Sequence, residues 1–273
     1  MNGISLLLYP LLACLILTGI HAYLGLHVVE RGVIFVDLSL AQIAALGTTI
    51  AYLAGHDLHS QASYYYSLGF TLLGAALFAI TRFEKKRIPQ EAFIGIVYAV
   101  SAALSILIVD RSPEGAEHIK YILVGNLLAV TRLEIAKMAV LYSLIGLIHW
   151  FFRKPLLAIS TSPESAGKEG LSVRAWDFLF YGTFGFVVTS SVAIAGVLLV
   201  FSFLIVPSVT AMLFSERIGV RLAIGWALGI LVSFLGMVAS YHYDTPTGAT
   251  VVVTFGLALL IALALNKIRG HPT

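Results

Sequence analysis

The chain has 273 residues, of which 59% are hydrophobic and only 11% are charged, and its mean hydropathy is +0.94. Soluble domains carry about 45–50% apolar and about 25% charged residues, so this chain has too little charge to cover a surface that faces water. The composition excludes an ordinary soluble protein, a disordered chain and a nucleic-acid binder that works through a basic face. It indicates a protein embedded in a lipid bilayer.

Continuous apolar runs recur along the whole chain. A helix needs about 20 mostly apolar residues to cross the hydrocarbon core, whereas outer-membrane strands alternate over about ten residues. Nine runs meet the helical requirement, in chain order 5–25, 33–54, 64–82, 92–109, 134–152, 177–194, 196–214, 221–240 and 248–266. The sixth and seventh nearly touch at Ala195-Gly196. We therefore expect an all-α, polytopic membrane protein with eight to nine transmembrane helices in a single domain over residues 1–273.

The positions of the 17 Lys and Arg residues predict the orientation, because cytoplasmic connections carry an excess of positive charge. The loop Thr81–Gln90 holds four of these residues and is taken as cytoplasmic. Nine spans then place the N-terminus outside and the C-terminus inside. Four positive residues lie outside and the other 13 inside; the outer four are Arg111, Lys120, Arg132 and Lys137. This distribution is typical of a multi-pass protein of a bacterial-type cytoplasmic membrane.

Sequence motifs for catalysis are missing. The chain has no G-x-x-x-x-G-K-[ST] loop, no G-x-S-x-G, no H-E-x-x-H and no C-x-x-C. The longest inner connection, Arg153–Ala175, is too short for a soluble catalytic domain. We therefore expect no enzyme and no cofactor bound by this chain, so that any ATP used for transport would be hydrolysed by a separate subunit.

Four segments together are distinctive. They are Glu91–Tyr98 (EAFIGIVY), Gly125–Val130 (GNLLAV), Ser162–Arg174 (SPESAGKEGLSVR) and Gly196–Ala211, with Asp244–Gly248 (DTPTG) further on. In this order and spacing the chain resembles the membrane permease of the zinc/manganese/iron family of ATP-binding-cassette (ABC) importers, over most of residues 30–265. The resemblance implies a type II importer for a divalent metal ion. It also implies a permease homodimer, cytoplasmic ATPase subunits and an extracytoplasmic metal-binding protein as partners.

The resemblance further implies that residues 160–175 form a coupling segment that sits in a groove of the ATPase. The local sequence suits a short helix, because Ser162 can cap it, Pro163 can open it, Glu164 lies in its first turn and Gly170 can end it. A connector helix that contacts no partner is the alternative. The residues expected to contact the ATPase are Ser162, Pro163, Glu164, Ala166, Gly170 and Leu171.

The second span carries polar residues at membrane depth, namely Asp37, Ser39 and Gln42. An ionisable residue inside a span is costly and is a functional hypothesis by default. Family members usually have an aspartate and a histidine four residues apart here, but this chain has Leu38 and Gln42 at those positions. Because an amide binds a transition metal more weakly than imidazole, either the site is rebuilt from Asp37, Gln42 and other spans, or the substrate differs from a free ion. Alternatively, Asp37 is the buried partner of Arg31 or of a helix end.

An outer loop offers a second set of candidate metal ligands. His56, Asp57 and His59 lie within four residues, and borderline divalent ions favour this mixture of imidazole and carboxylate. The alternative is a polar loop without a metal.

Two features of the last spans bear on helix packing. Pro207 removes a backbone hydrogen bond inside the seventh span and is expected to kink it, either to line a pathway or only to fit its neighbours. Gly225-x-x-x-Gly229 permits close contact between helices.

Two other functions stay open. An ABC permease for a metal chelate or siderophore would explain the missing histidine, although such permeases are usually longer. A stand-alone secondary transporter would typically show an internal repeat and several charges at mid-membrane, and neither is evident in this sequence.

Overall fold

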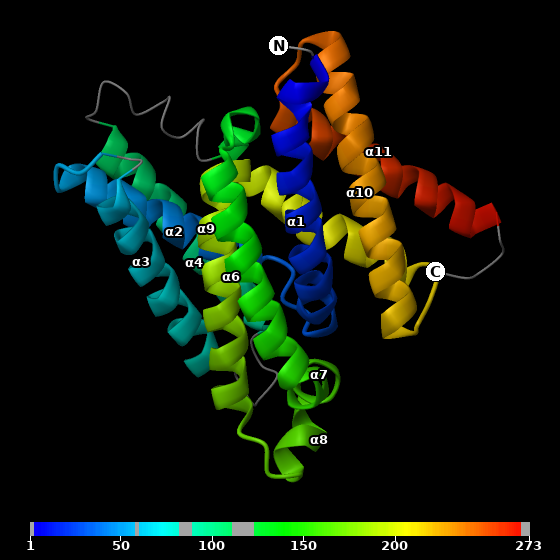
Figure 1. Cartoon of the computed structure of the whole chain (residues 1–273). Coiled ribbons are helices and arrows are strands. Elements are labelled where there is room, and N and C mark those ends of the chain that lie inside the picture. Colours follow the sequence, from blue (N-terminus) through cyan, green and yellow to red (C-terminus); the bar gives the residue numbers. More distant parts are fainter. Residues whose placement is uncertain (1–2, 58–59, 82–88, 111–122, 269–273) are drawn as a thin grey trace. The chain divides into compact units, whose positions relative to one another are not determined.

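The computed structural model describes residues 3–57, 60–81, 89–110 and 123–268 (Figure 1). Within these ranges every regular element is helical, which confirms the all-α prediction. The elements are α1 (Gly3–Glu30), α2 (Val36–Leu53), α3 (Gln61–Ile80), α4 (Gln90–Val109), the 3-10 turn η1 (Leu127–Ala129), α6 (Arg132–Phe151), α7 (Arg153–Thr161), α8 (Pro163–Lys168), α9 (Val173–Met212), α10 (Ile218–Tyr243) and α11 (Thr247–Ile268).

Eight of the described helices are long and apolar enough to cross a membrane, namely α1, α2, α3, α4, α6, α9, α10 and α11. Of these, α9 has 40 residues and is interrupted at Gly196, where φ is 75° and ψ is 161°. An α-helix of that length would extend about 60 Å, about twice the thickness of the hydrocarbon core. The interruption falls at the expected boundary between the sixth and seventh spans.

Part of the expected orientation rests on positive residues that lie outside the described part of the chain. These are Arg82, Lys85, Lys86, Arg87, Arg111, Lys120 and Arg269. The orientation therefore stays a prediction.

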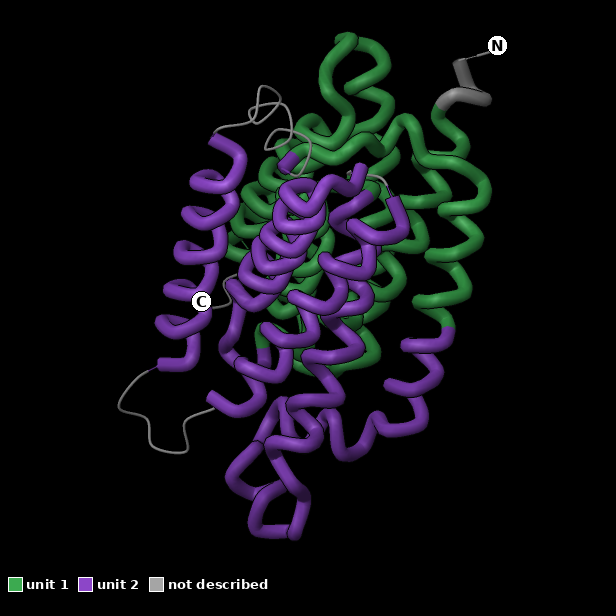
Figure 2. Tube along the Cα trace, turned by 90° about the vertical axis from the view of Figure 1, so that its left-hand side faces the viewer, with its two compact units in different colours: residues 1–29, 124–143, 194–273 green, residues 30–123, 144–193 purple. Residues whose placement is uncertain are grey.

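The chain forms two compact units, each assembled from segments that are far apart in the sequence (Figure 2). Unit 1 contains residues 1–29, 124–143 and 194–273, and unit 2 contains residues 30–123 and 144–193. The chain passes between the units four times, and one of these crossings, after residue 193, lies next to the interruption of α9. The expectation of a single domain stays a prediction.

In unit 1 the small residues of α10 pack against α1. A Cβ added at Gly229 would lie 2.5 Å from Thr18 Cγ2, and the Trp226 side chain donates a hydrogen bond to the Gly19 carbonyl at 3.1 Å. The close helix contact predicted from Gly225-x-x-x-Gly229 is confirmed. Pro207 faces the same contact, since a Cβ at Gly225 would lie 3.6 Å from Pro207 Cβ. The non-helical dihedral angles of α9 occur at Gly196 and not at Pro207, so a kink at the proline stays a prediction.

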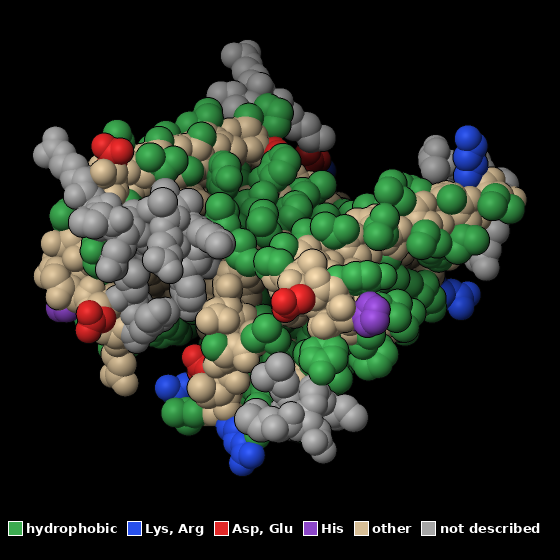
Figure 3. Space-filling view, turned by 90° about the horizontal axis from the view of Figure 1, so that it is seen from above, with side chains coloured by type: hydrophobic (Ala, Val, Ile, Leu, Met, Phe, Trp, Pro, Cys, Tyr) green, Lys and Arg blue, Asp and Glu red, His purple; other side chains and the backbone are tan. Residues whose placement is uncertain are grey.

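In unit 2, α2 packs against both α3 and α4. The backbones of α2 and α3 approach each other closely at Gly47, where an added Cβ would lie 2.7 Å from the Tyr66 carbonyl oxygen. Two-thirds (67%) of the most hydropathic stretch of α2 is buried, against 22% for α4 and α11. Hydrophobic side chains also cover broad stretches of the face drawn in Figure 3, where charged side chains are scattered. The low burial of α4 and α11 suits a lipid environment, whereas most of α2 is covered by other residues.

Candidate functional site

The N-terminus of α2 is held by a carboxylate from α4. The Glu91 side chain accepts a hydrogen bond from the backbone N–H of Phe35, the N-cap residue of α2, at 2.9 Å. The first N–H groups of a helix have no partner within the helix, so this contact caps α2 and ties it to the start of α4. Glu91 opens the first of the segments that carry the family resemblance. Its role escapes sequence reasoning because its partner lies 56 residues away.

Asp37 lies in the first turn of α2 and is only 1% exposed. Neither of its carboxylate oxygens has a hydrogen-bond partner among the described residues, and the buried Ser39 hydroxyl likewise has none. A buried carboxylate without a partner is costly, and the positive end of the α2 dipole offsets only part of that cost. The arrangement is therefore suited to receive a cation.

The alternative in which Asp37 pairs with Arg31 is wrong. The guanidinium of Arg31 forms its ion pair with Asp177, which lies near the start of α9. Sequence reasoning missed this pairing because the two residues are 146 positions apart.

Gln42 lies on α2 with 9% of its surface exposed. Because α2 is a continuous helix at about 100° per residue, Ser39 and Gln42 point to similar sides of it, while Asp37 and Gln42 point about 140° apart. The helix alone does not bring Asp37 and Gln42 together. A site that uses both would need groups from other elements.

The outer loop is described only in part. His56 and Asp57 are exposed, and His59 lies outside the described residues. The Asp57 carbonyl accepts a hydrogen bond from the Ser63 hydroxyl at 2.7 Å, so this residue helps to fix the start of α3. Within the described part of the chain, no three His, Cys, Asp or Glu residues are grouped so as to hold a metal ion. A metal site that includes His59 stays a prediction.

The short helix expected inside the coupling segment begins and ends where the sequence predicts. Helix α8 starts at Pro163 with Glu164 in its first turn, and the backbone turns at Gly170 with φ of 89°. The Leu171 N–H closes this turn by donating to the Ala166 carbonyl at 3.1 Å. One detail is wrong, because Ser162 is the N-cap residue by position but its side chain makes no capping hydrogen bond.

Helix α7 and helix α8 of the coupling segment are buried on one side and exposed on the other. Leu156 and Ile159 of α7 are fully buried, and Ala166 of α8 is 2% exposed. The exposed residues of α8 and the turn after it are Glu164, Ser165, Gly167, Lys168, Glu169 and Gly170. Within unit 2, α7 and α8 lie at the lower end of Figure 1, below the adjoining part of α9. The exposed residues of α8 and of the turn after it are mostly polar.

Three segments of unit 1 that contribute to the resemblance meet at one place. The Asn126 N–H donates to the Ile194 carbonyl at 3.1 Å, beside the interruption at Gly196. A Cβ at Gly125 would lie 2.4 Å from the Gly196 nitrogen, and one at Gly248 would lie 2.7 Å from the Val124 carbonyl oxygen. These glycines permit backbones that are distant in sequence to touch.

Comparison with known proteins agrees with this architecture. The model of the ABC 3 transport family matches residues 4–266. A probable iron transport system membrane protein of Haemophilus influenzae is 30% identical over 259 residues, which cover 95% of this chain and 93% of that protein. A manganese transport system membrane protein of Halalkalibacterium halodurans is 25% identical over 269 residues, with 98% and 90% coverage.

The fold also resembles that of a solved structure. PsaBC from Streptococcus pneumoniae, in complex with Fab, superposes with a TM-score of 0.78 at 22% identity, covering 96% of this chain and 92% of that one. The family model spans nearly the whole chain and covers the eight described helices that are long enough to cross a membrane, except for the outermost residues of α1 and α11. The chain therefore belongs to the ABC 3 transport family.

Proposed function

We propose that this chain is the permease subunit of an ABC importer that moves a divalent transition metal, namely manganese, iron or zinc, across the cytoplasmic membrane. The names of its relatives, a manganese and a probable iron transport system membrane protein, support the substrate class. In this function the chain is not an enzyme and binds no cofactor of its own. A separate ATPase subunit hydrolyses ATP.

The buried carboxylate of Asp37 is the observation that carries the metal substrate. It has no partner among the described residues, and it lies on one of the most buried helices of the molecule. Anionic oxygen is a suitable ligand for manganese and iron ions. A metal ion that passes α2 provides the positively charged partner that the Asp37 carboxylate lacks. Ser39 and Gln42 offer further oxygen atoms along the helix.

The exposed surface of residues 160–175 supports the proposed contact with the ATPase. This coupling segment presents polar residues of α8 and of the turn after it, and we place the ATPase contact there. A second copy of the permease and an extracytoplasmic metal-binding protein complete the importer. The N-terminus lies outside and the C-terminus inside, so the coupling segment faces the cytoplasm.

The test is Asp37→Asn, with uptake of Mn²⁺ and Fe²⁺ measured in proteoliposomes that contain the permease and its ATPase. We expect uptake to fall by about ten- to 100-fold, the range seen when groups around a bound metal are altered. Thermal stability should stay equal or rise, because the variant removes an unpaired buried charge. The matched control is Asp110→Asn, at an exposed acid that follows α4, and it should transport normally. Normal uptake by Asp37→Asn would contradict this metal pathway.

A permease for a metal chelate is the second candidate, and Gln42 in place of the family histidine favours it. The same vesicles distinguish the two substrates. Uptake of free Mn²⁺ or Fe²⁺ supports the ion, whereas uptake of iron only as a siderophore complex supports the chelate. Uptake that needs no ATP would instead indicate a secondary transporter.

A further inference from the structure

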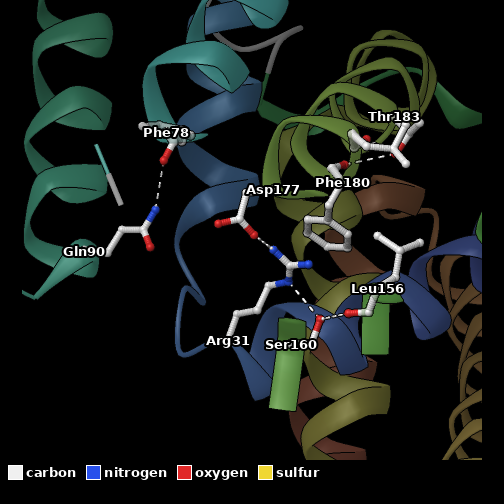
Figure 4. Close-up of polar contacts among 9 residues, drawn as sticks. Arg31, Phe78, Gln90, Leu156, Ser160, Asp177, Phe180 and Thr183 are labelled. Atoms are coloured by element: carbon white, nitrogen blue, oxygen red, sulfur yellow. Dashed lines mark hydrogen bonds and ion pairs between the residues drawn. The ribbon is translucent and has the colours of Figure 1, made fainter. Parts of the chain in front are cut away.

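A buried cluster in unit 2 joins three separate segments of the chain (Figure 4). Arg31, in the connection between α1 and α2, forms an ion pair with Asp177 of α9. Its Nε donates a hydrogen bond to the Ser160 hydroxyl of α7 at 2.9 Å. The guanidinium carbon lies 4.0 Å from the centre of the Phe180 ring, a distance typical of a cation–π contact.

The cluster is shielded from solvent. The side chains of Arg31 and Asp177 are 1% and 0% exposed, and Ser160 is 2% exposed. The Ser160 hydroxyl, which accepts from Arg31, in turn donates a hydrogen bond to the Leu156 carbonyl of the α7 backbone at 2.8 Å. Replacing a buried ion pair by apolar residues is often neutral or stabilising, so a requirement for stability alone does not account for this cluster.

The cluster lies between the coupling segment and the start of α2. Ser160 lies at the beginning of the coupling segment and Asp177 lies two residues beyond its end, so Arg31 holds both ends of it. On the other side, Arg31 precedes α2 by five residues, and α2 carries Asp37. Glu91 fixes the start of α2 through the Phe35 N–H. One side chain thus connects the proposed ATPase contact to the start of the helix that bears the unpaired carboxylate.

We propose that Arg31 is a positioning residue that transmits movement of the coupling segment to α2. When the ATPase displaces residues 160–175, both ends of the segment pull on the same guanidinium, and the connection to α2 moves with it. The planar guanidinium is needed because it contacts Asp177, Ser160 and Phe180 simultaneously, which an ammonium group does not do. This inference rests on the proposed function, since it requires an ATPase on the coupling segment.

The test uses the assembled importer in proteoliposomes and three variants, Arg31→Lys, Asp177→Asn and the double variant Arg31→Leu with Asp177→Leu. Three quantities are measured, namely copurification of the ATPase, ATP hydrolysis and Mn²⁺ uptake. We expect the ATPase to copurify and ATP to be hydrolysed, while the Mn²⁺ transported per ATP falls by about tenfold or more, a change of about 1.4 kcal/mol in the coupled step. If the single variants fail to fold, the double variant still provides the test, because it removes both charges and leaves no unpaired buried charge.

Lys154→Ala is the matched control, since Lys154 is an exposed cation on α7 outside the coupling segment, and it should keep the normal ratio of metal to ATP. A normal ratio in the double variant would overturn the proposal and leave the pair a structural feature. Failure of the proposed function gives a different result. In that case Ala166→Glu, which disturbs α8, leaves copurification of the ATPase unchanged, or the wild type shows no ATP-dependent uptake.

Discussion

Single glycines at backbone contacts show how narrowly this fold is specified at the residue scale. Gly125 has φ of 67°, and an added Cβ would lie 2.3 Å from the Ala195 carbonyl carbon. Both the backbone angle and the space require glycine there. The neighbouring Asn126 N–H donates a hydrogen bond to the Ile194 carbonyl, beside the interruption of α9. The family segment that begins at Gly125 therefore has a structural explanation.

We expect Gly125→Ala to destabilise the protein by about 1–3 kcal/mol from the backbone strain alone, with a further cost from the contact with Ala195. Thermal unfolding of the detergent-purified permease measures this as a lower midpoint. Gly69→Ala is the control, because Gly69 lies in the middle of α3 with no atom within 4 Å of its added Cβ. An unchanged midpoint for Gly125→Ala would show that the segment does not pack on α9 as described.

At the element scale, the contact between α2 and α3 offers a matched pair of glycines. An added Cβ at Gly47 meets backbone, 2.7 Å from the Tyr66 carbonyl oxygen. One at Gly74 meets only side chains, and the nearest atom is the end of the Ile43 side chain at 2.6 Å. A side-chain end can rotate away, but two helix backbones separate only if the whole contact shifts.

Gly47→Ala should therefore cost about 1–3 kcal/mol of stability, the usual range for overpacking. The cost of Gly74→Ala should be smaller, because the end of the Ile43 side chain can rotate away. The gain of about 1 kcal/mol in helix propensity applies to both variants, since both glycines lie inside helices. Denaturation curves of the two variants, recorded under the same detergent conditions, give the comparison. A larger loss for Gly74→Ala than for Gly47→Ala would mean that α3 crosses α2 elsewhere.

The sequence predicts the positions of the helices well. Apolar runs locate the long helices because the bilayer demands a continuous stretch of about 20 residues whatever the neighbours are. The limits of α8 follow from Pro163 and Gly170 because those residues act locally. By contrast, the Ser162 cap fails, and the Arg31–Asp177 and Glu91–Phe35 contacts stay hidden, because nothing local in the sequence says which distant backbone or charge will be adjacent.

The candidate site is predicted less completely than the fold. Asp37 stands out in the sequence because it is an acid inside an apolar run, and the structure shows that it is buried and has no partner among the described residues. The proposed rebuilding around Gln42 does not follow from α2 alone, because the helix directs the two side chains apart. Periodicity gives the angle between two residues of one helix, but not which groups of other helices face them.

At the scale of the whole molecule, the interruption of α9 determines the topology. If residues 173–195 and 197–212 each cross the bilayer, the chain crosses nine times and its two ends lie on opposite sides. If α9 crosses once, eight crossings place both ends on the same side. A single straight crossing is unfavourable, because about 30 Å of a 40-residue apolar helix would extend into water.

We therefore expect the ends of the described chain to be labelled from opposite sides of the membrane. In a Cys14→Ala background, Gly3→Cys should react with an impermeant maleimide on intact cells, and Lys267→Cys only after permeabilisation. Ser162→Cys reports on the coupling segment and should behave like Lys267→Cys, because four further crossings, two in α9 and one each in α10 and α11, return the chain to the same side. Labelling of positions 3 and 267 from one side would mean that α9 crosses once, and the coupling segment would then lie on the side opposite to position 267.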